Sequence, residues 1–197
     1  MPLKTNRKYR CAWVGEEPLM IAYHDKEWGV PVRNDKKIFE FLVLESAQAG
    51  LSWKTILHKR EGYRNLFAGF EPTKVARFDA KKVTALLKNP AIIRNRLKIQ
   101  ATIRNAKAFL QVQKEFGTFS AYMWSFVDGK QINGRRKSLA DVPAITKEAG
   151  LFAKDLKKRG FAFLGPTVIY AHMQAVGMAN DHEMACFRYK EIKNLTE

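Results

Sequence analysis

Apolar side chains in this chain recur at helical spacing over most of its length, and strand-like alternation is scarce. The clearest case is the segment Leu97–Phe116, whose apolar stripe has intervals of four, three and four residues (Ile99, Ile103, Ala106 and Leu110). The apolar run Phe161–Leu164 is too short to build a sheet. This pattern predicts an all-α protein.

Capping residues and Pro or Gly positions set the boundaries of the other predicted helices. One helix is predicted from Asn34 or Asp35 to Gly50, and Ser52 is expected to cap the next. Further helices are predicted to start at Pro72 and to cover Asp79–Asn89, Phe119–Val127, Leu151–Arg159 and Pro166–Val176, with a basic loop at Lys130–Ala144. We expect one domain over residues 11–190, as one body or two helical lobes, between a flexible basic arm (1–10) and a tail (191–197).

The net charge of the chain indicates the class of molecule that it binds. The chain has 35 Lys and Arg against 19 Asp and Glu, a net charge of +16, and such an excess steers a protein toward phosphate backbones. No apolar run approaches the ~18–20 residues of a membrane span, and the basic, polar N-terminus does not resemble a secretory signal. Two cysteines cannot form a disulfide framework, so the expected compartment is a reducing cytoplasm.

Both cysteines and two of the four histidines lie near the chain ends. Cys11 and His24 are close to the start, and His182 and Cys186 are close to the end, spaced so that one helical turn would place them on one face. Two thiolates and two imidazoles form a ligand set for tetrahedral, structural zinc. The spacing leaves a second interpretation open, in which these four side chains are reduced cysteines and histidines that never meet.

A carboxylate falls on the apolar face of a predicted helix. The segment Ile38–Glu45 is apolar nearly all round, which is typical of a buried helix, and Glu45 lies on its apolar stripe. A buried carboxylate costs several kcal/mol unless it is paired or hydrogen-bonded. Glu45 therefore marks either a site or a capping or buried ion-pair role near the helix end. Aromatic residues cluster nearby and fit a flat, cationic ligand, although core packing is the alternative for each one (Trp13, Tyr23, Trp28 and Trp53).

A helix, a short apolar hairpin and a second helix are predicted from Lys154 to Val176. Gly165 permits a close approach of the backbone, and Thr167 adds a hydroxyl group at the start of the second helix. Free N–H groups at a helix start attract phosphate, and nearby cations add charge (Lys157, Lys158 and Arg159). The alternative is an ordinary helix corner with a solvated basic face.

Motifs in order along the chain carry a family resemblance. They are CAWV at 11–14, YHDKEWGVP at 23–31, LESAQAGLSW at 44–53, IIRNR at 92–96, WSFV at 124–127, KKRGF at 157–161 and NDH at 180–182. These motifs, which extend from Cys11 to about Cys186, resemble the DNA-3-methyladenine glycosylase I family. The resemblance implies an all-α fold of the helix-hairpin-helix glycosylase superfamily. It also implies excision of 3-methyladenine from alkylated double-stranded DNA. Nothing in the sequence calls for more than a monomer, and the expected location is the bacterial cytoplasm, beside the nucleoid.

The resemblance also implies roles for individual residues. Structural zinc would join the N- and C-terminal segments (ligands Cys11, His24, His182 and Cys186). Glu45 would recognise the flipped base and Trp53 would stack on it, within walls formed by other side chains (Trp13, Met20, Tyr23 and Trp28). Leu51 would fill the gap left in the duplex, beside further contacts to DNA (Gln48, Gly50, Lys158, Gly165 and Thr167).

One position departs from the family pattern, and two positions near the hairpin differ from the wider superfamily. Met20 stands where many relatives have tyrosine, which removes a hydroxyl group from the pocket, and Phe163 replaces the first glycine of the superfamily hairpin. Thr167 lies near the position where bifunctional relatives have a nucleophilic lysine, so no lyase step is expected.

The implied mechanism relies on the charge of the methylated base. A cationic base is already a good leaving group, so the protein mainly has to find, extrude and hold it. Glu45, expected to be ionised, would favour the cation, and Tyr23 would orient the attacking water. The alternative function is a zinc-stabilised DNA- or RNA-binding helical module without catalysis. That module accounts for the charge and the ligand set, but not for Glu45 among aromatic side chains.

Overall fold

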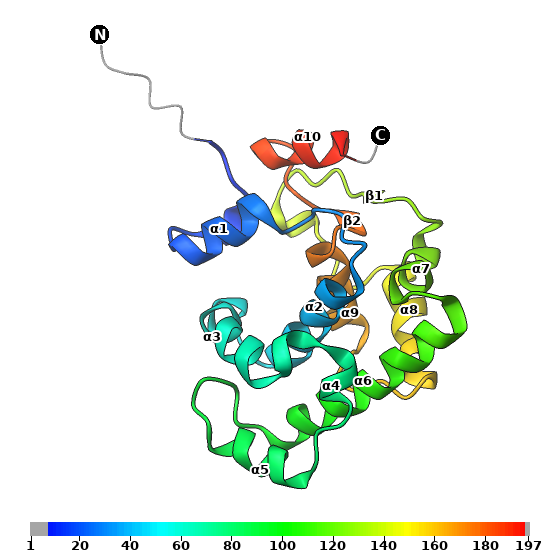
Figure 1. Cartoon of the computed structure of the whole chain (residues 1–197). Coiled ribbons are helices and arrows are strands. Elements are labelled where there is room, and N and C mark those ends of the chain that lie inside the picture. The colour runs from blue at the N-terminus through cyan, green and yellow to red at the C-terminus, as the bar shows by residue number, and fades with distance from the viewer. Residues whose placement is uncertain (1–7, 196–197) are drawn as a thin grey trace.

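The computed structural model describes residues 8–195, and regular structure in this range is almost entirely helical (Figure 1). The α-helices are α1 Pro18–Lys26, α2 Asp35–Gln48, α3 Trp53–Leu66, α4 Pro72–Val75, α5 Ala80–Lys88, α6 Arg96–Phe116, α7 Phe119–Trp124, α8 Lys147–Lys158, α9 Pro166–Ala175 and α10 Phe187–Asn194. Short 3-10 turns are η1 Ala12–Val14, η2 Ala68–Phe70, η3 Ser125–Val127 and η4 Leu139–Asp141. The predicted helical class is therefore confirmed.

Local capping explains why the predicted boundaries of α2 and α3 agree with the observed ones. The Asn34 side chain accepts a hydrogen bond from the backbone N–H of Lys37 at 3.0 Å, and Ser52 caps α3 in the same way. Gly50 follows α2 with a φ of +76°, a conformation that side chains with a Cβ rarely adopt.

Other boundaries depend on contacts that the periodicity does not show. Helix α8 starts at Lys147, four residues before the predicted Leu151, because Thr146 caps it. The pattern predicts neither α1 nor α10, and the predicted loop 130–144 contains η4 and one of two short strands. Those strands, β1 Ile132–Asn133 and β2 Ala179–Asn180, pair in parallel and are the exception to an all-helical chain in the described range.

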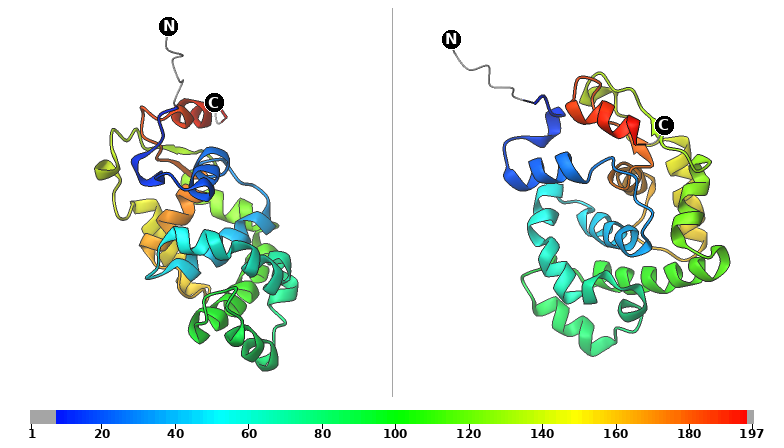
Figure 2. Two further views of the ribbon diagram at one scale, coloured as in Figure 1. Left: turned by 90° about the vertical axis from the view of Figure 1, so that its left-hand side faces the viewer. Right: turned by 45° about the horizontal axis from the view of Figure 1, so that its top comes forward.

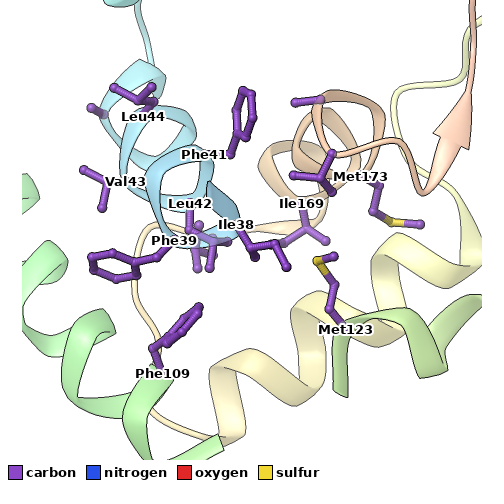
Figure 3. Close-up of a cluster of buried hydrophobic side chains, with 14 of the residues drawn as sticks. Ile38, Phe39, Phe41, Leu42, Val43, Leu44, Phe109, Met123, Ile169 and Met173 are labelled. Carbon is purple, nitrogen blue, oxygen red and sulfur yellow. The ribbon is translucent and has the colours of Figure 1, made fainter. Parts of the chain in front are cut away.

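Helix α2 lies at the centre of the core. All its residues from position 38 to 47 are buried, which explains the apolar run seen in the sequence. Figure 3 shows Ile38, Phe39 and Leu42 near side chains from α6, α7 and α9 (Phe109, Met123, Ile169 and Met173). The tilted view of Figure 2 shows the other helices running around α2. Glu45 is thus carried on a helix that is buried over most of its length.

The two ends of the described chain are joined to each other. Residues 1–7 of the predicted arm lie outside the described residues, but Tyr9 and Arg10 belong to the folded body. The carbonyl of Tyr9 accepts a hydrogen bond from the backbone of Phe187 at 3.1 Å, and Arg10 pairs with Asp25 at 2.7 Å. Part of the predicted tail, 191–194, completes α10, whose Ile192 is buried. Within residues 8–195, no helix is long and apolar enough to cross a bilayer.

Candidate active site and metal centre

A cavity of about 230 Å³ opens beside the C-terminal end of α2, and we call it the aromatic cavity. Glu45 and Gln48 of α2 line it, together with four aromatic side chains from η1, α1, the segment after α1, and the start of α3 (Trp13, Tyr23, Trp28 and Trp53). The structure therefore brings together the carboxylate and the aromatic residues singled out in the sequence. Met20 packs against the core and is not among the residues that line the aromatic cavity.

Burial sets the protonation state of Glu45. The residue is 4% exposed and forms no hydrogen bond or ion pair within residues 8–195. Burial raises the pKa of its carboxyl group to about 8, so the group is mainly neutral at pH 7 in the free protein. The expected ionised form of Glu45 refers to the complex with a cationic base, whereas the free protein holds the neutral form. Glu40 of the same helix is equally buried, but it accepts hydrogen bonds from Arg60 and Arg64 at 2.8 and 2.9 Å.

The aromatic side chains contact one another around the cavity. The ring centroids of Trp13 and Trp28 are 4.9 Å apart in an edge-on arrangement, and those of Tyr23 and Trp53 are 5.1 Å apart. The indole nitrogens of Trp13 and Trp53 are buried without a hydrogen-bond partner in the described part of the chain. A buried unpaired N–H costs stability, which is tolerated where a ligand supplies the acceptor. Burial and the nearby Glu45 raise the pKa of Tyr23 well above 10.

Sequence reasoning missed the opposite wall of the cavity. Leu139 and Val142 contribute to it from the predicted loop, and Gln174, Asp181 and Glu183 contribute from α9 and the segment after it. Asp181 accepts hydrogen bonds from Arg136 and Gln174, each at 2.8 Å, and from the hydroxyl of Tyr170. Asp181 belongs to the NDH motif at 180–182. No periodicity in the sequence, however, indicates that the loop 137–142 lies against the cavity.

The residues expected to contact DNA lie at two exposed places. Leu51 is 40% exposed in the turn between α2 and α3, next to Gly50. Gly165, Thr167 and Lys158 are exposed around the turn between α8 and α9. Arg159, by contrast, pairs with Glu115 and Asp155 at 2.5 and 2.6 Å, so its charge is already matched within the protein.

The four predicted metal ligands converge in one buried cluster. Their donor atoms lie within 4.8 Å of one another, and all four side chains are buried (Cys11, His24, His182 and Cys186). The sulfur of Cys11 is 3.5 Å from Nδ1 of His182, and the sulfur of Cys186 is 3.5 Å from Nε2 of His24. Tetrahedral zinc with ordinary Zn–S and Zn–N bonds requires a sulfur–nitrogen separation of about 3.6 Å, so the donor set fits this ion. The expected helical turn is wrong in one respect, because His182–Cys186 is a non-helical turn before α10.

Further contacts orient the imidazole rings of this cluster. Nδ1 of His24 is 2.8 Å from a carboxylate oxygen of Asp25, and Nε2 of His182 is 3.0 Å from the carbonyl oxygen of Trp28. Such partners leave the opposite ring nitrogen free to bind a metal. The backbone N–H of Glu183 also donates to the sulfur of Cys11 at 3.3 Å. The cluster adjoins the aromatic cavity through Cys11.

Comparison with known families and proteins identifies the kind of enzyme. The family model for methyladenine glycosylase matches residues 13–189. This chain belongs to the methyladenine glycosylase family. The DNA-3-methyladenine glycosylase 1 of Escherichia coli (strain K12) is 47% identical over 180 residues, which are 91% of this chain and 96% of that protein. The DNA-3-methyladenine glycosylase of Haemophilus influenzae is 46% identical over 177 residues, 90% of this chain and 96% of the relative. The chain is thus a glycosylase, a hydrolase that acts on N-glycosyl bonds.

Solved structures agree with this assignment. A crystal structure of 3-methyladenine DNA glycosylase I superposes with a TM-score of 0.89 at 49% identity, covering 91% of this glycosylase and 98% of that chain. A variant of 3-methyladenine DNA glycosylase I in complex with 3-methyladenine superposes with a TM-score of 0.88 at 36% identity, covering 90% and 96%. The enzyme from Staphylococcus aureus also has a TM-score of 0.88, at 37% identity, covering 90% and 95%.

Proposed function

We propose that this glycosylase hydrolyses the N-glycosidic bond of 3-methyladenine in alkylated double-stranded DNA, after the base has been flipped into the aromatic cavity. The observation that carries the proposal is the unpaired, buried carboxyl group of Glu45 in a cavity lined by four aromatic side chains. A flat, positively charged base matches both features. The relatives are named for the same base, 3-methyladenine, which is consistent with this choice.

Charge provides the selectivity in this proposal. A cationic base entering the cavity stabilises the carboxylate form of Glu45, so the carboxyl group releases its proton as the base binds. The resulting ion pair is enclosed by apolar rings, where electrostatic attraction is stronger than in water. Neutral adenine offers no positive charge to balance the carboxylate. The unpartnered indole N–H group of Trp13 adds a donor for the base, and Trp53 stacks on the base.

The hydrolytic step needs little acid catalysis, since the cationic base is a good leaving group. Water attacks C1′ of the sugar, the glycosidic bond breaks, and its electron pair stays with the departing base, which becomes neutral. The water proton passes to solvent or to the Glu45 carboxylate. Tyr23 keeps its hydroxyl proton because its pKa is raised, so it can orient the water without acting as a base. Thr167 provides no amine, and we propose a monofunctional enzyme without lyase activity.

In the proposed complex, two exposed places hold the duplex. The α8–turn–α9 segment acts as the helix-hairpin-helix element, in which Gly165 and Lys158 contact the phosphate backbone and Thr167 adds a hydroxyl. The turn after α2 carries Leu51, which fills the gap that the flipped base leaves, with Gly50 and Gln48 beside it. The α2 helix links this turn to Glu45 over less than two helical turns, so insertion and base capture are coupled mechanically.

We also propose that Cys11, His24, His182 and Cys186 hold structural zinc, which supplies a crosslink and no chemistry to the reaction. The separations given above fit the ion, and the site ties η1 and α1 to the segment before α10. Metal analysis should find about one zinc per chain, and Cys186→Ser should lose the metal and lower the Tm. Far less than one zinc per chain in the wild type would refute the site.

The deciding experiment incubates the protein with methylated duplex DNA and quantifies the released bases by chromatography. The wild type should release 3-methyladenine, and Glu45→Gln should release it at least 100-fold more slowly, since the carboxylate charge is lost while the shape is kept. Glu191→Gln, an exposed position on α10, is the matched control and should behave as the wild type. Tight DNA binding by the wild type without base release would support the non-catalytic module instead.

A further inference from the structure

A second exposed leucine lies beside the turn that carries Leu51. Leu97, in the first turn of α6, is 63% exposed. Its neighbour Lys98 is buried and reaches the end of α2, where its ammonium group donates to the carbonyl oxygens of Ala47 and Ala49 at 2.8 and 2.7 Å. The start of α6 is therefore fixed against the α2–α3 turn. Leu97 and Leu51 are two apolar side chains on adjoining, exposed turns.

The segment that leads to Leu97 is held rigidly. The carbonyl of Pro90 accepts a hydrogen bond from Lys59 of α3 at 2.7 Å, and the backbone N–H of Ile93 donates to the hydroxyl of Tyr63 at 3.3 Å. The backbone of Ala91 also approaches Gly62 so closely that a Cβ there would lie 2.2 Å from the Ala91 oxygen. This rigidity means that presenting Leu97 to a partner costs little ordering entropy.

Charge around Leu97 identifies the partner. Arg94 and Arg96 are exposed on either side of Asn95 and form no ion pair within the described residues. From position 80 to 114 the chain has nine Lys and Arg and no Asp or Glu. An exposed apolar side chain that directly follows two unpaired arginines, in a segment without acidic residues, suits the polyanionic backbone and stacked bases of a nucleic acid.

We propose that Leu97 is a second insertion point for the damaged duplex, resting on the base stack next to the gap filled by Leu51, while Arg94 and Arg96 bind the flanking phosphates. This inference rests on the proposed function, because it assumes a duplex opened at one base. Leu51 and Leu97 then hold the opened stack from two turns that Lys98 keeps in fixed relation. The interaction is specific for opened DNA, since an intact stack has no exposed base face for Leu97 to contact.

The experiment compares Leu97→Ala with Leu195→Ala, an equally exposed leucine (62%) at the other end of the molecule. Each variant is titrated with a duplex containing a tetrahydrofuran abasic-site analogue and with the undamaged duplex. Leu97→Ala should weaken binding to the abasic duplex about tenfold and leave the undamaged Kd within twofold. Leu195→Ala should change neither. Arg94→Ala and Arg96→Ala should weaken both duplexes and each reduce the salt dependence by about one phosphate contact.

A second readout reports the stack directly. Two duplexes are used, one with 2-aminopurine opposite the abasic site and one with 2-aminopurine beside it. Binding of the wild type should raise the 2-aminopurine fluorescence of one of these duplexes, and Leu97→Ala should not cause that rise. Unchanged affinity and fluorescence in Leu97→Ala would overturn the proposal, as would a concentration-dependent wild-type dimer in sedimentation that Leu97→Ala abolishes. If the wild type releases 3-methyladenine while Leu97→Ala matches it in these titrations, the second insertion point fails and the proposed function stands.

Discussion

The ammonium group of Lys98 lies 2.8 Å from the carbonyl oxygen of Ala47, so the long helix α6 caps the C-terminal end of α2. A cation at this place satisfies carbonyl groups that have no partner within α2 and complements the negative end of its dipole. The sequence pattern suggests instead that Lys98 contributes to the basic surface, because it lies off the apolar stripe of α6. The structure uses this charge internally.

Replacing Lys98 by methionine should therefore destabilise the protein rather than only weaken DNA binding. The apolar stem is kept, but one buried and one partly buried carbonyl group lose their donor, which costs about 1–3 kcal/mol. Urea unfolding measures the change. Lys107→Met, an exposed position on the same helix, is the matched control and should shift the midpoint little. Equal midpoints for the two variants would contradict the capping role.

Glu45 makes activity and stability depend on pH in opposite directions. Burial raises the pKa of its carboxyl group to about 8, and the cationic base requires the carboxylate, so kcat/KM for base release should rise with pH up to about 8. Below that value the slope should approach tenfold per pH unit. The native state holds this proton while the unfolded chain releases it near pH 4.5, so the contribution of Glu45 to stability falls as pH rises from about 4.5 to 8.

Glu45→Gln separates these two effects. It removes the titrating group, so the free energy of unfolding of the wild type relative to Glu45→Gln should decrease as pH rises through that window. Urea unfolding at pH 5, 6, 7 and 8 gives this difference. A difference independent of pH would mean that the Glu45 carboxyl is not neutral in the native state.

His172 should make the fold sensitive to acid. Both its ring nitrogens are buried without a hydrogen-bond partner in the described range, and burial lowers the pKa of the imidazole to about 3. The unfolded chain takes up this proton near pH 6.5, so stability is lost as pH falls from about 6.5 toward 3. His172→Leu should lose less stability between pH 7 and pH 4 than the wild type. A loss of stability in His172→Leu equal to that of the wild type over this pH range would contradict the role of His172.

Much of the fold could be predicted because its determinants are local. Asn34, Ser52 and Asp79 cap the helices that they precede, and each uses a side chain that bonds to a backbone N–H three residues later. Helices α1 and α10 could not be predicted in this way. The first buries Tyr23 and His24 without a continuous apolar stripe, and the second is placed by contacts with the opposite chain end, including Tyr9.

The same distinction between local and long-range determinants applies to the candidate site. Glu45 could be found because a carboxylate interrupts an apolar pattern, and the aromatic residues because they cluster in the sequence. Leu139 and Val142 could not be found, because they reach the cavity through the long-range contact of Arg136 with Asp181. The protonation state of Glu45 also depends on burial by residues far away in the chain.

The same contact allows a last prediction, which concerns the wall of the aromatic cavity. Arg136 donates to Asp181 at 2.8 Å, to the hydroxyl of Tyr170 at 3.1 Å and to the carbonyl of Asp141 at 3.2 Å, so it ties the loop that carries Leu139 and Val142 to the far side of the cavity. Arg136→Met would leave Asp181 buried without its cation, which costs about 3 kcal/mol. Adding Asp181→Asn to Arg136→Met should recover part of the lost unfolding free energy, because the unpaired charge is removed. Urea unfolding of the two single variants and the double variant measures the coupling. KM for base release should rise in Arg136→Met with a smaller change in kcat, since Leu139 and Val142 line the cavity that is proposed to hold the base. If the loss of unfolding free energy in the double variant equals the sum of the losses in the two single variants, Arg136 and Asp181 do not act as a pair that holds the loop.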